Sequence, residues 1–302
     1  MTPLAEHLEA YRKHLLAKGC SGRHIKLTVA RTRRIIDRCG FSYWRDIRAS
    51  RVSGLLAELR ADTTTENGKV CRGIGPQTSN LYLASFRAFC AWCVEDGRAS
   101  ESPVASLRPM NTQTDRRHDR RALSVEELVR LLDSTSEEPE RFDMTGPRRE
   151  LLYRLGVETG LRASEFDSLT RDSFDLSLER PVVRVKAAYS KRRRDDVVPL
   201  RTETAAALAD VLTTMFPQDH LFAIHDRGAK MMRADLAAAR RKWVAEAPTA
   251  AQRRDRRESD LLRYKDSRGR FADFHALRHS TASLLAAGGV HRQQACRAVS
   301  QR

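Results

Sequence analysis

The pattern of apolar and polar positions predicts a chain that is mostly helical at its N-terminal end. Apolar residues recur every three or four positions over residues 4–16, over Ala49–Arg60 and onward from Pro76, which is the spacing of amphipathic helices. Ser21 is placed to cap one more helix, and Ser50 is expected to cap the one at Ala49–Arg60. Four helices within the first 108 residues indicate a small helical domain.

Three segments lack this periodicity. Residues 61–76 are polar, contain glycine and are predicted to form a loop. Residues 109–121, PMNTQTDRRHDRR, are predicted to be a basic linker, either a solvated tether or a segment lying along a phosphate backbone. Residues 250–270 are highly charged and predict a mobile loop or a frayed helix.

A second domain is predicted to begin at residue 122 and to mix helices with a small sheet. Ser124 followed three residues later by Glu127 has the spacing of a capping box at a helix start. Valines at 182, 183 and 185, then at 197 and 198, predict two strands joined by a turn. Helices are expected at about 125–133, 148–160, 202–214, 230–247 and His275–Ala287. The predicted fold class is therefore mainly α with a small β-sheet.

The charge of the chain is strongly positive, and the excess is spread over both domains. The net charge is +16. Residues 1–110 carry 18 Lys and Arg against 10 Asp and Glu, and the remainder carries 37 against 29, so each part contributes +8. An even basic excess favours a protein that contacts a polyanion with both domains, and nucleic acid is the expected partner over a merely solvated surface.

Other composition features narrow the class of protein. No run of eighteen apolar residues occurs and the N-terminus lacks a secretory core, so we expect a cytoplasmic protein with no membrane partner. Six cysteines are scattered, and the only close pair is Cys90 and Cys93 within an apolar helix pattern. A zinc ribbon requires a second pair, so buried thiols are expected and no metal or cofactor is predicted.

Three short motifs require an explanation together. The first is TGLRASE, residues 159–165, in which Gly160 can end one helix and Arg162 lies in the first turn of the next. The second is the basic turn SKRRR, residues 190–194, between the two predicted strands. The third is HALRH, residues 275–279, whose two histidines share one helical face. Taken singly, these motifs are also typical of a surface arginine, a solvated hairpin tip and a two-histidine metal site.

In this order and spacing the three motifs resemble those of the tyrosine recombinases, the phage-integrase family. The resemblance covers nearly the whole chain. It implies a helical core-binding (SAM-like) domain over 1–108, the linker over 109–121 and an α+β catalytic domain of tyrosine-recombinase type over 122–302. The implied activity is site-specific breakage and rejoining of DNA strands through a 3′-phosphotyrosyl intermediate.

The resemblance also implies roles for individual residues. Arg162 and Arg278 match the two catalytic arginines, and His275 matches the histidine of the HxxR motif. Lys191 matches the lysine of the hairpin, for which Lys186 is a weaker candidate because it is predicted to lie in the strand. A Glu at 165 would orient the first arginine, and the His at 279 matches a position that is more often structural.

The expected partner is double-stranded DNA carrying a specific recombination site, and the resemblance implies a tetramer assembled on two such sites. Further DNA contacts are predicted from the basic face of the helix at 23–38, from the linker and from the hairpin turn. The residues predicted for these contacts are Lys26, Arg31, Arg33, Arg34, Arg38, Arg116, Arg117, Arg192 and Arg193.

The sequence departs from the family after Gly289. The family continues with a further helix, a leucine-glycine-histidine stretch and the nucleophilic tyrosine. Here the segment after Val290 reads HRQQACRAVSQR, and none of the six tyrosines follows Arg278. A frameshift or truncation near His291 would produce such an end, and a natural regulatory paralogue is the alternative. We therefore expect a chain that binds DNA without cleaving it.

The sequence is also compatible with two other functions. A DNA-binding regulator without catalytic activity would read its site with the basic helix at 23–38, and residues 1–108 alone would then give full selectivity. A hydrolytic nuclease would hold a metal at His275 and His279, and its cleavage would be sensitive to EDTA.

Overall fold

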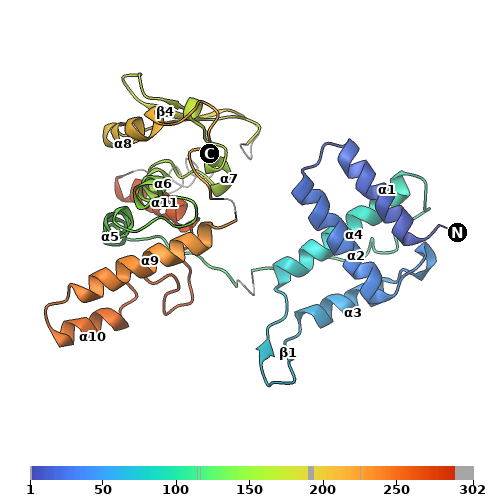
Figure 1. Cartoon of the computed structure of the whole chain (residues 1–302). Coiled ribbons are helices and arrows are strands. Elements are labelled where there is room, and N and C mark those ends of the chain that lie inside the picture. Colours follow the sequence, from blue (N-terminus) through green and yellow to red (C-terminus); the bar gives the residue numbers. More distant parts are fainter. Residues whose placement is uncertain (1, 114, 116, 190–193, 225, 290–302) are drawn as a thin grey trace. The chain divides into compact units, whose positions relative to one another are not determined.

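The computed structural model describes residues 2–113, 115, 117–189, 194–224 and 226–289. It divides into two compact units, Met1–Arg117 and His118–Arg302, each with a hydrophobic core of its own (Figure 1). The division falls inside the segment 109–121. None of the helices in the described part of the chain combines the length and the apolar character needed to cross a bilayer.

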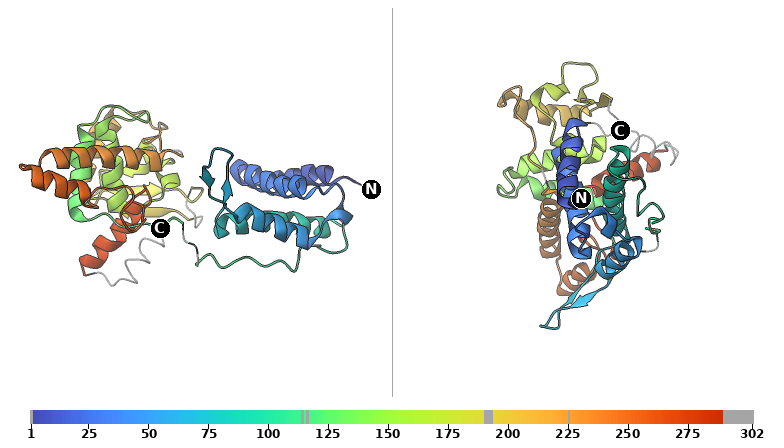
Figure 2. Two further views of the ribbon diagram at one scale, coloured as in Figure 1. Left: turned by 90° about the horizontal axis from the view of Figure 1, so that it is seen from below. Right: turned by 90° about the vertical axis from the view of Figure 1, so that its right-hand side faces the viewer.

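The first unit is a cluster of helices around an aromatic and aliphatic core. Leu4, Phe86 and Phe89 are fully buried in this core, as the apolar periodicity predicts. The helix α2 packs against α1, α3 and α4 (Figure 2). The elements are α1 (Leu4–Ala17), α2 (Gly22–Cys39), the 3-10 helix η1 (Trp44–Asp46), α3 (Ala49–Arg60) and α4 (Pro76–Glu95).

Serine caps were predicted for two of these helices, and one of the two predictions is confirmed. The Ser21 hydroxyl accepts a hydrogen bond from the His24 amide at 3.3 Å and caps α2, which confirms that prediction. The range Ala49–Arg60 is confirmed for α3, but its N-cap is Arg48 and not Ser50, which lies within the first turn. A serine cap therefore fixed the start of one helix and not of the other.

The segment 61–76, predicted as a loop, contains a short antiparallel hairpin. Its strands are β1 (Thr63–Thr64) and β2 (Val70–Cys71), with Thr63 opposite Cys71. The hairpin projects from the helices of the first unit (Figure 1). Two-residue strands leave no alternation of apolar and polar positions, so the periodicity could not reveal them.

The close cysteine pair faces the core of the first unit. Cys90 and Cys93 are both fully buried free thiols on α4. Burial raises the pKa of Cys93 to about 12 and raises the pKa of Cys90 as well. These thiols are inert core residues. The prediction of buried thiols is wrong for Cys71, which is exposed on β2, and Cys296 lies outside the described residues.

The second unit is built around α6. This helix contacts α5, α8 and α11, and α5 in turn packs on α9. The predicted capping box at the start of α5 is confirmed, because Ser124 and Glu127 bond each other's backbone amides. The helices are α5 (Val125–Ser136), α6 (Gly146–Thr159), α7 (Ala163–Phe166), η2 (Arg171–Ser173), α8 (Thr202–Thr213), α9 (Gly228–Ala245), α10 (Ala250–Glu258) and α11 (Ala276–Ala287).

A three-stranded antiparallel sheet lies beside α8 in this unit (Figure 1). The strands β3 (Phe174–Asp175), β4 (Val182–Val185) and β5 (Asp196–Pro199) pair in that order. The two valine strands are confirmed, and Val183 lies opposite Val198. Strand β3 was not predicted, since it is two residues long.

The charged segment 250–270 contains a regular helix. α10 begins at Ala250, and the hydroxyl of its N-cap residue Thr249 accepts from the Gln252 amide at 3.2 Å. At its other end, the Arg240 guanidinium donates to the carbonyls of Arg256, Arg257 and Ser259. An arginine from α9 thus satisfies the last carbonyls of α10, a tertiary contact that sequence periodicity does not contain.

Candidate active site

The turn between α6 and α7 places the first candidate arginine. Gly160 ends α6 in the left-handed conformation, with φ of 64°, which is readily accessible to glycine. Arg162 follows as the N-cap residue of α7, one position before the first turn in which it was predicted.

A buried carboxylate holds this arginine. Glu165 Oε1 accepts from Arg162 Nη1 at 2.7 Å, and Glu165 Oε2 accepts from the Arg162 amide at 2.8 Å. The Glu165 side chain is 1% exposed, whereas that of Arg162 is 22% exposed. A buried carboxylate that accepts from both the guanidinium and the amide of Arg162 fixes the orientation of the guanidinium, while part of the Arg162 side chain still faces solvent.

The second candidate arginine reaches the same turn from α11. Arg278 Nη1 donates to the carbonyl of Gly160, two residues before Arg162. Its side chain is largely buried. The contact is supported by packing, because the Thr281 hydroxyl donates to the Gly156 carbonyl at 3.4 Å and Leu277 lies against Gly156. The structure therefore brings Arg278 to the turn that carries Arg162.

The two histidines of HALRH lie together at the start of α11. Their ring centroids are 5.5 Å apart and the ring planes are at 79°. The pKa of His275 is lowered to about 4, first by desolvation and then by the positive charge of Arg120. The pKa of His279 is lowered by the same two leading causes. Both rings are partly open to solvent and neutral near pH 7, the state in which an imidazole accepts a proton.

A metal site at His275 and His279 would need a further ligand beside the two imidazoles. Within the described ranges, no group of three or more His, Cys, Asp or Glu side chains is arranged to hold a metal ion. The carboxylate nearest the histidine pair in sequence, Asp273, is engaged by His118 and Arg120.

The candidate lysine of the hairpin lies outside the described residues, together with Arg192 and Arg193. Lys186 is exposed and lies directly after β4, which ends at Val185, not within the strand as predicted. The Ala187 amide donates to Asp195 Oδ1 at 2.7 Å, so the described base of the hairpin is closed by a side-chain contact.

The predicted DNA contacts on α2 differ in their surroundings. Lys26, Arg33 and Arg38 are exposed, and Arg31 is half-buried. Arg34 donates to the Tyr82 hydroxyl at 3.0 Å and its guanidinium lies 5.6 Å from the ring centroid. That residue therefore also helps to join α2 to α4.

The predicted linker contacts are only partly described. Arg117 pairs with Asp115 at 2.7 Å and donates to the Gly73 carbonyl, which fastens it to the first unit. Arg116 lies outside the described residues. In the second unit, His118 and Arg120 contact Asp273, two residues before His275. Sequence reasoning placed these two residues in a linker and missed the contact, because it spans more than 150 positions.

Comparisons with known proteins agree with these motifs. The model of the phage integrase family matches residues 121–297. The chain is 30% identical over 210 residues to the tyrosine recombinase XerC of Neisseria meningitidis serogroup C (strain FAM18), a match that covers 69% of this chain and 64% of the relative. It is 29% identical over 183 residues to the tyrosine recombinase XerD of Xanthomonas campestris pv. campestris, covering 59% and 51%. The chain thus spans less than two thirds of the length of these relatives.

Solved structures share the fold over nearly the whole chain. A lambda integrase dimer bound to a COC′ core site has a TM-score of 0.62 at 15% identity and covers 99% of this chain and 91% of that one. A Tn1549 transposon integrase in complex with circular intermediate DNA has a TM-score of 0.57 at 14% identity and covers 97% and 91%. The predicted fold class, a helical core-binding domain followed by a mixed catalytic domain, is confirmed.

Proposed function

Because the chain belongs to the phage integrase family, we propose that it binds duplex DNA and surrounds one backbone phosphate with Arg162, Arg278 and His275. The observation that carries this proposal is the hydrogen bond from Arg278 to the Gly160 carbonyl, at the turn that presents Arg162. It joins two guanidinium-bearing segments far apart in sequence. The proposed compartment is the cytoplasm.

The chemistry suits a phosphodiester. Two guanidiniums provide paired donors for the non-bridging oxygens, and donors held in place beforehand help most when charge develops in the transition state. The Glu165 carboxylate supplies that restraint for Arg162. A neutral His275 would take part in moving the proton of the attacking group.

The rest of the reaction is proposed from the family resemblance. A tyrosine hydroxyl would attack the phosphorus, forming a 3′-phosphotyrosyl bond as the bond to the 5′ oxygen breaks. Lys191 would donate the proton that leaves with the 5′ oxygen. The covalent bond retains the energy of the phosphodiester, so the strand can be rejoined to a new 5′ hydroxyl without ATP.

A polypeptide of these 302 residues is proposed to bind without cleaving, because its sequence contains no tyrosine beyond Arg278. The test is incubation with a nicked suicide substrate bearing its own site. No covalent protein–DNA adduct is expected on a denaturing gel. A covalent adduct would show that one of the six tyrosines attacks from elsewhere in the chain.

DNA is the proposed partner, and assembly on two sites is a further proposal. A lambda integrase tetramer bound to a Holliday junction shares this fold with a TM-score of 0.60. Selection from random duplexes followed by a salt titration tests DNA binding. We expect one enriched sequence and an affinity that falls with a log–log slope of about −0.9 per phosphate contacted. Absence of any enriched duplex would contradict the proposal.

The exposed basic residues of α2 favour a second candidate, a DNA-binding regulator that reads its site with the first unit alone. On this reading, a fragment of residues 1–108 has the full selectivity of the chain. The recombinase reading expects the fragment to lose affinity for the duplex that the whole chain selects, because the phosphate contacts of the second unit are gone.

A further inference from the structure

The first residues of the second unit lie against the segment that leads into α11. We call residues 118–123 the entry strap. The His118 ring stacks on Phe271 with centroids 4.2 Å apart. The Phe271 amide donates to the Asp119 carbonyl at 2.7 Å, and the Arg121 amide donates to the Phe271 carbonyl at 3.0 Å. The strap therefore runs parallel to the chain just before His275.

Two side chains of the strap converge on one carboxylate. Arg120 Nε donates to both oxygens of Asp273, at 2.9 and 2.8 Å, and His118 Nε2 lies 2.8 Å from Asp273 Oδ2. The Asp273 side chain is 8% exposed. Its Oδ1 also accepts from the Ala276 amide at 3.2 Å, the first amide of α11. The strap thus holds a carboxylate that also bonds the amide directly after His275.

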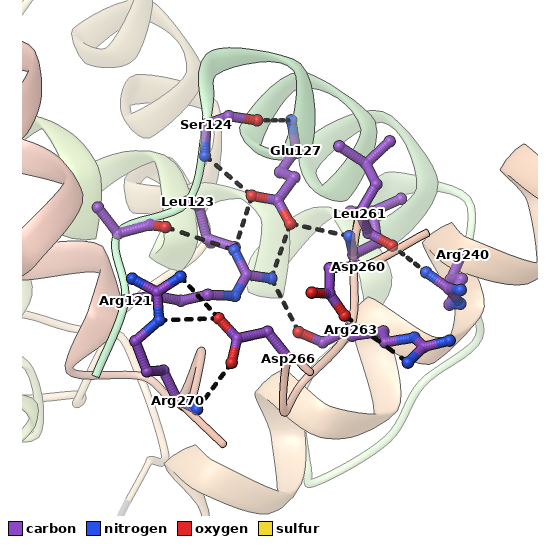
Figure 3. A network of polar contacts seen from close by, with 12 residues as sticks. Arg121, Leu123, Ser124, Glu127, Arg240, Asp260, Leu261, Arg263, Asp266 and Arg270 are labelled. Carbon is purple, nitrogen blue, oxygen red and sulfur yellow. Dashed lines mark hydrogen bonds and ion pairs between the residues drawn. The ribbon is translucent and has the colours of Figure 1, made fainter. Parts of the chain in front are cut away.

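The other end of the strap is held by side chains that are almost fully buried. Arg121 forms two hydrogen bonds to the Glu127 carboxylate, at 2.7 and 2.8 Å, and donates to the Arg263 carbonyl at 2.8 Å (Figure 3). The Leu123 amide donates to the Ser280 hydroxyl at 2.8 Å. Asp273 and Ser280 lie on either side of the HALRH motif, so the strap contacts the chain both before and after the candidate site residues.

We propose that Arg120, assisted by His118, is a positioning residue that acts through Asp273 to place His275 and Arg278 at the phosphate. Only the phosphate-binding roles of the last two residues rest on the proposed function. The placement itself follows from the contacts of the strap.

The charges around the histidine pair make this placement measurable. The groups that face His275 are Arg120, His279, Arg278 and Asp273. Of these, only Asp273 raises the pKa of His275, while Arg120 is the strongest of the charges that lower it. Removing the Arg120 charge should therefore raise the pKa of His275, and removing the Asp273 charge should lower it. General loosening of the fold would not shift this pKa in opposite directions in the two variants.

The experiment is an NMR titration of the histidine rings in the full chain. Arg120→Met is expected to raise the pKa of both His275 and His279, and Arg120→Lys is expected to keep them low because the positive charge remains. Asp273→Asn is expected to lower the pKa of His275. The matched control is Arg130→Met, which removes another arginine that forms ion pairs, on α5.

An unchanged His275 pKa in Arg120→Met, or an equal rise in the Arg130→Met control, would overturn the proposal. If Arg120→Met fails to fold, the opposite shift in Asp273→Asn and the rescue in Arg120→Lys carry the test. These measurements need no DNA, so they distinguish failure of the strap from failure of the proposed function.

A binding measurement adds the functional arm. Arg120→Met is expected to weaken affinity for the selected duplex on the order of tenfold more than Arg130→Met, because misplaced donors lose charge-assisted hydrogen bonds. Arg120→Lys is expected to lie between the two. Equal losses for Arg120→Met and Arg130→Met would show that the arginine acts only through its charge and would overturn the positioning role.

Discussion

Two arginine–carboxylate pairs of the second unit, Arg149–Asp235 and Arg162–Glu165, invite comparison. In the first, Arg149 Nε lies 3.0 Å from Asp235 Oδ2, and both side chains are 0% exposed. In the second, Arg162 Nη1 lies 2.7 Å from Glu165 Oε1 and keeps 22% of its side-chain surface exposed. Arg149 lies on α6 and Arg162 lies shortly after its end. Only Arg162 has exposed side-chain surface that a ligand could contact.

The surroundings explain the difference. Arg149 also donates to the carbonyls of Pro139 and Met144, and the Tyr153 hydroxyl donates to Asp235 at 2.6 Å. This buried network joins α6 to α9 and is a structural device. The Glu165 carboxylate also accepts a hydrogen bond from the backbone amide of Arg162. The Arg162 guanidinium is thereby held at the surface and is not enclosed in the core. Pairing with a carboxylate therefore does not distinguish the two arginines. The exposure of Arg162, at a turn that Arg278 also contacts, is what favours the proposed phosphate contact for Arg162.

The largest expected effect concerns the buried pair. Asp235→Asn leaves the Arg149 charge without its counter-ion in the core, and such changes cost about 3–5 kcal/mol of folding free energy. Chemical denaturation followed by circular dichroism measures it. The control is Glu150→Gln, in the partly exposed Arg154–Glu150 pair of α6, for which a loss below about 1 kcal/mol is expected. Equal losses of folding free energy in Asp235→Asn and Glu150→Gln would show that burial does not determine what these pairs contribute to stability.

The next effect concerns binding. Arg162→Ala is expected to weaken affinity for the selected duplex about 10- to 100-fold, the value of one or two charge-assisted hydrogen bonds. The variant is also expected to lose folding free energy, because the Glu165 carboxylate, which is 1% exposed, loses its counter-ion. Fluorescence anisotropy at fixed salt measures it. Arg154→Ala is the matched control, since it removes a 40% exposed arginine of α6. A loss as large in the control would mean that only net charge matters.

A smaller effect on stability is expected from a single hydrogen bond of the buried network. Tyr153→Phe removes the hydroxyl that donates to Asp235 and is expected to cost about 1–1.5 kcal/mol of folding free energy. DNA affinity should stay unchanged, because this side chain is fully buried. A change in affinity without a change in stability would place Tyr153 in the binding site instead.

The smallest effect is a pH dependence of stability. His275 stays neutral in the folded chain down to about pH 4, whereas its ordinary pKa is 6.5. The unfolded state therefore binds more protons in this window, and stability falls as pH is lowered from 6.5 to about 4. The exposed surface of the ring limits the loss to about 1 kcal/mol. Denaturation at several pH values should show a shallower fall for His275→Asn, and parallel curves would contradict the shift.

Features decided by neighbouring residues could be predicted from the sequence. The glycine that ends α6, the capping box at Ser124 and Glu127, and the range of α3 all follow from local backbone chemistry. The approach of Arg162 and Arg278 was expected only through the family resemblance, since no local rule joins segments more than a hundred residues apart.

Contacts between distant segments account for what sequence reasoning missed. Arg149 and Asp235 are 86 positions apart, and Arg120 and Asp273 are 153 apart, so neither pair leaves a periodic signal. In the sequence, Arg120 resembles any other charge of a polar linker. Arg34 was likewise predicted only as a DNA contact on the basic face of α2. No feature of the sequence indicated its hydrogen bond to Tyr82.

The most direct measurement replaces single phosphates of the selected duplex with neutral methylphosphonates and compares the wild-type chain with Arg162→Ala. At the position where replacement weakens wild-type binding most, we predict that replacement causes no further loss of affinity in the variant, because the phosphate and the guanidinium are partners in one interaction. Additive losses at that position would contradict it, since Arg162 would then lie away from the phosphate that matters.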